Sequence, residues 1–156
     1  MVTENNPHSY LVGWIINYLK NRDLMHQNIE SIETNKNGFD VYIKFKDKEQ
    51  FFIVKPIIEK NDDIIPKFNE EGYFGLVMFN TLSNFNFLVK DWMKLAKFKH
   101  LSIYFVNHFS QLDKKWIICP YVHNSICDEN ALEKGLRAMF EMVEPLTEDQ
   151  IKDRFK

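Results

Sequence analysis

Residues 73–107, YFGLVMFNTLSNFNFLVKDWMKLAKFKHLSIYFVN, contain the pattern that decides the fold class. Two short apolar runs, 73–79 and 101–107, flank a segment over 84–98 in which apolar residues recur at helical spacing. A strand, a helix and a strand in this order predict a parallel pair of strands joined by a right-handed crossover. The stretch therefore indicates an α/β protein.

A three-stranded meander is predicted before this unit. Residues 39–46 alternate between apolar and polar side chains, as in a strand with one buried face. Asn37-Gly38 is a strong hairpin signal, and it links this strand to a shorter one over 28–34. A second turn at 47–49 leads to a strand over 51–55, which Pro56 ends.

The remaining segments complete a single domain over residues 1–156 with a mixed central β-sheet flanked by helices. Residues 56–72 form a long polar connection, which we expect to be mobile. Further elements are expected at both ends of the chain: helices over 7–21, over 129–143 and after Pro145, and a strand over 116–122.

Bulk composition narrows the class of protein. The 156 residues suit one domain, 45% of them are hydrophobic, and the net charge is −2. A near-neutral chain has no global field that attracts nucleic acid or an anionic membrane, although a local basic patch can still do so. The first ten residues lack the pattern of a secretory signal, and no apolar run is long enough to span a membrane. We expect a cytoplasmic protein with no membrane partner.

One pair of residues has the chemistry of a metal-dependent site. If residues 39–46 and 51–55 form a hairpin, antiparallel register places Asp40 beside Lys55 or Pro56. A carboxylate can bind Mg²⁺, and a nearby lysine can orient or activate a water. The alternative interpretation is a cross-strand ion pair on the surface.

The order of elements and this pair resemble the restriction-endonuclease-like, or PD-(D/E)xK, superfamily. That family has a core of a helix, a three-stranded meander, a helix and a further strand, and the resemblance covers residues 7–107. It implies Mg²⁺ as cofactor, Asp40 as metal ligand and catalytic residue, and Lys55 as the catalytic lysine. The family's second acid falls on Ile53, which cannot bind a metal, so the motif is degenerate.

Two classes of function follow. In the first, the protein is a nuclease-like domain that binds or cleaves DNA or RNA with a degenerate or migrated site, and Lys44 and Lys46 contact phosphates. In the second, it is a non-catalytic module that binds other proteins or forms a homodimer through apolar surface left over from the helix over 129–143 or from the strand edge over 116–122. Neither the substrate nor the oligomeric state can be inferred from the sequence.

Two weaker patterns have structural interpretations beside the functional ones. Cys119, His123 and Cys127 are zinc-ligand types, but their spacing matches no zinc motif, and separate structural roles are favoured. Residues 80–84, NTLSN, stand at a strand-to-helix junction that can bind an anion. Helix capping explains that stretch more simply.

Overall fold

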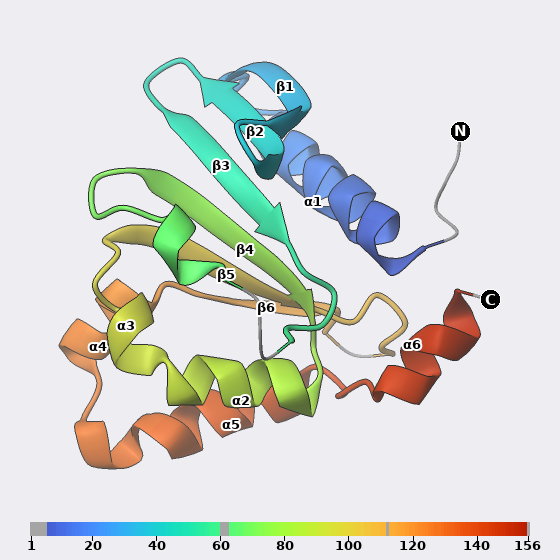
Figure 1. Ribbon diagram of the computed structural model, residues 1–156, viewed down its shortest axis with the longest axis vertical. Helices are drawn as coiled ribbons and strands as arrows, with labels where there is room; N and C mark the ends of the chain where they lie inside the picture. Colours follow the sequence, from blue (N-terminus) through green and yellow to red (C-terminus); the bar gives the residue numbers. More distant parts are fainter. Residues whose placement is uncertain (1–5, 60–62, 112, 156) are drawn as a thin grey trace.

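The computed structural model describes residues 6–59, 63–111 and 113–155. It is one α/β domain built on a six-stranded mixed sheet, in which the strands lie in the order in which they occur along the chain (Figure 1). The strands are β1 (Ile29–Lys36), β2 (Phe39–Phe45), β3 (Glu49–Val54), β4 (Tyr73–Phe79), β5 (His100–Val106) and β6 (Lys115–Ile118).

Helices cover both faces of the sheet (Figure 1). One face packs on α1 (Pro7–Asp23) and α6 (Glu148–Arg154). The other packs on α2 (Leu82–Lys90), α3 (Trp92–Leu95) and α5 (Leu132–Met142), with α4 (Pro120–Ile126) beside α3. Two 3-10 turns, η1 (Ile65–Lys67) and η2 (Glu129–Ala131), complete the fold. Among the described residues, no helix combines the length and the apolar character needed to cross a membrane.

The predicted meander and β-α-β unit are both present. β1, β2 and β3 are antiparallel neighbours, and Asn37 and Gly38 take the positive φ angles of +55° and +81° that a tight hairpin turn requires. β3, β4 and β5 are parallel, and α2 and α3 cross between the last two. The helix predicted over 84–98 is two helices, since the backbone leaves the helical conformation at Asp91.

The strand prediction for residues 116–122 was wrong in its C-terminal part. The strand predicted over 116–122 ends at Ile118, because Pro120 begins α4 at the position where a helix needs no N–H donor. Two described residues of the connection over 56–72, which was expected to be mobile, are buried in the core: Ile64 and Phe68, with the turn η1 between them. Residues 60–62 of that connection lie outside the described residues.

Gly75 in β4 is required by close packing. A Cβ atom at this position would lie 2.3 Å from the ring of Phe52 on the neighbouring strand β3. The fully buried Phe52 ring therefore occupies the space above Gly75 and contributes to the core beneath α1.

Asn80 joins the end of β4 to two distant parts of the chain. Its side chain is fully buried, and its Nδ2 donates hydrogen bonds to the carbonyl oxygens of Phe140 and Val143 at the end of α5. Its Oδ1 accepts a hydrogen bond from the Trp116 indole N–H of β6 at 2.8 Å. The amide thus satisfies carbonyls that a helix C-terminus leaves unpaired.

We predict that Asn80→Asp strongly destabilises the protein. The substituted carboxylate has nearly the same shape, but it would direct an oxygen instead of an N–H group at two buried carbonyl oxygens. A buried charge without a matching donor costs about 3–5 kcal/mol, or roughly 10 °C in melting temperature. The control is Asn130→Asp, because Asn130 is exposed. Equal melting temperatures for Asn80→Asp and Asn130→Asp, measured by thermal denaturation, would contradict the role assigned to Asn80.

Candidate functional site

The start of β2 separates from β3, and Asp40 fills the gap. Regular pairing of the two strands ends at Val41 and Phe52. The Lys55 N–H donates to β4, so the preceding N–H, that of Val54, faces β2. There it donates to the Asp40 carboxylate oxygen Oδ2 at 2.7 Å. The side chain of Asp40 thus replaces a backbone acceptor.

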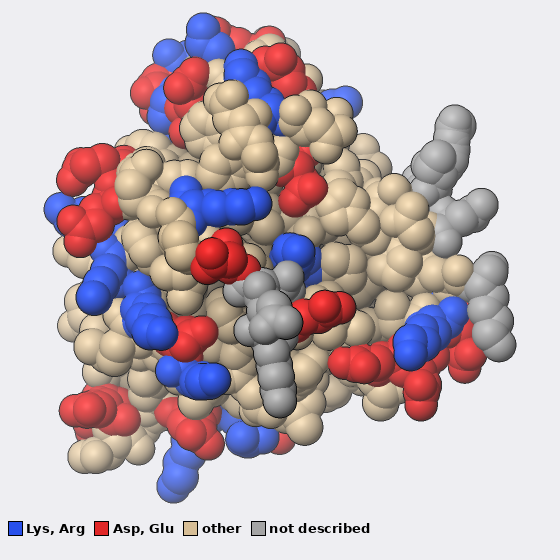
Figure 2. Space-filling model, viewed as in Figure 1, with Lys and Arg blue, Asp and Glu red and all other residues tan. Residues whose placement is uncertain are grey.

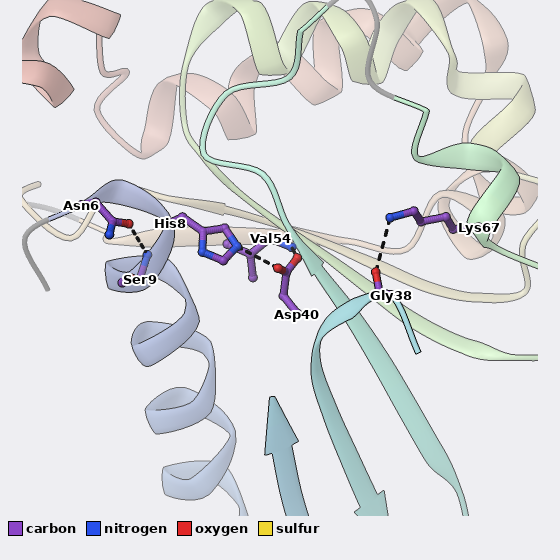
Figure 3. A network of polar contacts seen from close by, with 7 residues as sticks. All are labelled: Asn6, His8, Ser9, Gly38, Asp40, Val54 and Lys67. Carbon is purple, nitrogen blue, oxygen red and sulfur yellow. Dashed lines mark hydrogen bonds and ion pairs between the residues drawn. The ribbon is translucent and has the colours of Figure 1, made fainter. Parts of the chain in front are cut away.

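The second oxygen of Asp40 is also engaged (Figure 3). The His8 imidazole Nε2, in the first turn of α1, lies 2.8 Å from Oδ1. An ionised carboxylate has no proton, so His8 is the donor. The side chains of His8 and Asp40 are 46% and 25% exposed, so the pair is partly screened by solvent. Asp40 therefore joins α1, β2 and β3.

Asp40 and Lys55 line the same hollow, as part of a mixed set of charges. The hollow has a volume of about 370 Å³. Lys67 closes one side, where its Nζ donates to the Gly38 carbonyl at 3.3 Å (Figure 3). Among the residues that the structure describes, the charged or titratable side chains in the lining are those of His8, Asp40, Lys55, Glu59 and Lys67.

The predicted register between Asp40 and Lys55 was wrong. The hairpin closes on Phe45 and Lys48, so its turn is centred one residue earlier than expected. Continuation of the observed register sets Asp40 opposite Ile53 and not opposite Lys55. The two side chains share the hollow because the strands separate here, and not because they form a cross-strand pair.

The hollow does not have the donor set of a magnesium nuclease. Ile53, which the expected resemblance aligns with the family's second acid, is 2% exposed and packs in the core on the side of α2. Both oxygens of Asp40 already accept hydrogen bonds. Within the described parts of the chain, no three His, Cys, Asp or Glu side chains are grouped as metal ligands. These residues therefore do not fit the ion that the resemblance implies.

Lys44 and Lys46 lie away from this hollow. Lys44 is four residues beyond Asp40 along β2, a distance of about 13 Å at the usual strand rise. Its Nζ is 3.6 Å from Glu30 on β1, and both lysines are exposed. The fold thus places Asp40 with Lys55 and leaves the two predicted phosphate contacts at the other end of the strand.

Cys119, His123 and Cys127 are distributed along α4. Cys119 precedes the helix, and its Sγ lies 3.3 Å from the Ser102 hydroxyl on β5. His123 packs edge-on against Trp92 of α3, and Cys127 follows the last turn. The structure thus gives each residue different neighbours, in line with the separate structural roles that the sequence favoured.

The junction over residues 80–84 caps α2. The Thr81 hydroxyl accepts a hydrogen bond from the Asn84 N–H at 3.2 Å. The buried Asn84 amide bonds in turn to Pro56 and Ile58, and so holds the connection after β3. The capping interpretation is confirmed.

Sequence reasoning missed three residues that line the hollow: His8, Glu59 and Lys67. The position of His8 in the first turn of a helix could be predicted, since it follows the capping residue Asn6 and the helix-starting Pro7. That position alone does not relate His8 to Asp40. Glu59 and Lys67 belong to the connection after β3, and no spacing rule relates them to Asp40. The chain matches no protein-family model, no curated protein and no solved structure.

We predict that Asp40→Ala lowers the stability, because the partly buried Val54 N–H then loses its acceptor. Such a loss costs about 1–3 kcal/mol, a few degrees in melting temperature. Asp40→Asn retains an acceptor oxygen and should lose less. The matched control is Asp113→Ala, at an exposed carboxylate, with an expected change within about 0.5 kcal/mol. If Asp40→Ala and Asp113→Ala have the same melting temperature, the Asp40 carboxylate has no structural role.

Proposed function

We propose that the protein is a non-cleaving nucleic-acid-binding domain of restriction-endonuclease-like descent. One observation carries the proposal. Asp40 and Lys55, at the family's acid and lysine positions, line one hollow, while the position of the second acid is occupied by the buried Ile53. Such a site retains groups that meet a phosphate backbone but lacks the carboxylate pair that would hold a catalytic metal.

The arrangement of the elements supports the proposed descent. α1 and the β1–β2–β3 meander are followed by α2 and β5, in the family's order. β4 is an additional strand between β3 and α2, and it is parallel to both of its neighbours. The resemblance therefore requires one inserted strand.

The charges around the hollow favour weak and salt-sensitive binding. Among the described lining residues, Lys55 and Lys67 are the lysine side chains, while the Asp40 carboxylate accepts hydrogen bonds from His8 and from the Val54 N–H. Figure 2 shows basic and acidic side chains interspersed over this face, without a broad area of one sign. A nucleic-acid strand leaving the hollow along β2 would reach Lys44 and Lys46. The attraction is thus local, and added salt should screen it.

Fluorescence anisotropy with labelled single-stranded and duplex oligonucleotides, at low salt, tests the proposal. We expect salt-dependent binding by the wild type, with a weaker salt dependence for Lys55→Ala and Lys67→Ala, by about one phosphate contact each. The control is Lys134→Ala, an exposed lysine on α5. All three variants should have melting temperatures close to that of the wild type, because each change removes a lysine side chain that is not part of the hydrophobic core.

The same oligonucleotides, incubated with Mg²⁺ or Mn²⁺, should remain intact. Cleavage that is lost in Lys55→Ala would contradict the non-cleaving part of the proposal. A lack of salt-dependent binding to either oligonucleotide, or equal binding by Lys55→Ala and the wild type, would contradict the whole proposal.

An exposed apolar surface supports a second candidate, a homodimer. Tyr121, Val122 and Ile126 on α4 are 42%, 51% and 79% exposed. Grouped apolar side chains on one helix are typical of an interaction surface. Light scattering should then show a dimer that Ile126→Asp dissociates, while Met25→Asp, at an exposed apolar residue after α1, leaves it intact. A wild type that is monomeric at high concentration would contradict this candidate.

A further inference from the structure

A second hollow, of about 400 Å³, lies at the other end of α1. Gln50, Tyr73 and His100 are side by side across β3, β4 and β5, at the start of these strands, and form its floor. Ser102 and Cys119 extend this floor. The residues that follow on the same face, such as Phe52, are covered by α1. The helix ends too early to cover the first row, so that row stays open.

The walls come from three separate parts of the chain. Arg22 and Asp23 belong to the last turn of α1, and His26 follows it. Lys48 comes from the β2–β3 turn, and Lys99 directly precedes β5. The hollow is therefore concave and bounded on several sides, as small-molecule sites are.

Positive charge dominates this hollow. Arg22, Lys48 and Lys99 make no ion pair with any residue that the structure describes. Asp23 is the one carboxylate among the described lining residues, and its two oxygens accept the backbone N–H groups of Asn28 and Ile29 at 2.8 and 2.9 Å. A concave surface with uncompensated charge concentrates the field and attracts anions.

Aromatic rings contact two of these three cations, Lys48 and Arg22. The Lys48 Nζ lies 4.8 Å from the centre of the Tyr73 ring, which stacks on His100 with a centroid distance of 4.1 Å. The Arg22 guanidinium lies 5.7 Å from the Tyr18 ring. Contacts of this kind orient a cation without neutralising it, so its charge remains available to a ligand.

Tyr104 adds a neutral donor. It lines the hollow and is 4% exposed, and its hydroxyl has no hydrogen-bond partner among the described residues. Burial raises the pKa of Tyr104 to about 12, so the phenol keeps its proton at neutral pH and its O–H can donate a hydrogen bond to an anion.

The end of α1 opposes an anion only weakly. A helix C-terminus has a partial charge of about −0.5, which is smaller than that of the three cations around it. Its carbonyl groups are also partly used, since Asn21 and Asp23 accept N–H groups from the turn that follows the helix.

We propose that this hollow binds a small phosphorylated molecule of about mononucleotide size. Arg22, Lys48 and Lys99 would hold the phosphate, since guanidinium and ammonium groups match its charge and its acceptor oxygens. The volume exceeds that of a phosphate ion alone, so the organic part would lie over the floor of Tyr73, Ser102 and Tyr104. The site is separate from the hollow of Asp40 and Lys55, and it does not depend on the proposed nucleic-acid binding.

Calorimetric titration and thermal shift of the full chain with AMP, ribose 5-phosphate, inorganic phosphate and adenosine test this inference. We expect AMP or ribose 5-phosphate to bind and to raise the melting temperature, inorganic phosphate to bind more weakly, and adenosine to have no effect. Arg22→Gln and Lys99→Gln should each weaken binding about tenfold, the scale of one charge-assisted contact. Lys20→Gln is the matched control, since Lys20 is an exposed basic residue in the same turn of α1 but does not line the hollow.

Tyr104→Phe removes only the hydroxyl and should weaken binding several-fold without unfolding the chain. Lys55→Ala should leave the binding of AMP unchanged, which separates this test from that of the proposed function. The inference is overturned if no phosphate-bearing probe binds, or if folded Arg22→Gln and Lys99→Gln bind like the wild type. It is also overturned if a 5′-phosphorylated oligonucleotide binds here while AMP, ribose 5-phosphate and phosphate do not.

Discussion

The buried amide of Asn80 is the interaction on which the arrangement of the C-terminal half depends. A buried amide without partners would destabilise the fold, but this one has three side-chain hydrogen bonds to α5 and β6. Its backbone also bonds to Val106 and Leu146. A single residue at the end of β4 thus sets where the last strand and α5 lie on the sheet.

The single helix α1 shapes both hollows. At its N-terminus, His8 engages Asp40 and ties the helix to the separated ends of β2 and β3. At its C-terminus the helix stops before the start of β3, β4 and β5, so polar and aromatic residues of the sheet remain open to solvent. The first hollow has mixed charge and the second is mainly cationic. This difference is the physical basis for assigning them different ligands.

The residues on which the proposed nuclease resemblance rests have structural roles in this fold. The proposed resemblance assigns Asp40 to a metal-binding acid, yet its oxygens serve as acceptors for His8 and for the Val54 N–H. Ile53 contributes apolar area to the core at the position where a metal site would need a carboxylate. In this chain, residues of a metal-site pattern therefore stabilise the packing of α1 and β3, while Lys55 and Lys67 remain at the rim of the hollow.

Local patterns in the sequence determined the class of the fold, because alternation, helical spacing and turn residues act over a few neighbouring positions. The strand over 73–79 and the Asn37-Gly38 turn could be predicted in this way. The prediction of a strand over 116–122 was wrong beyond Ile118, because the apolar residues of this stretch fit either a strand or a helix. Pro120 begins the helix α4. Only the tertiary structure decided which side chains meet. Arg22, Lys48 and Lys99 are brought together by strand register and by the length of α1, and no sequence spacing records either of these.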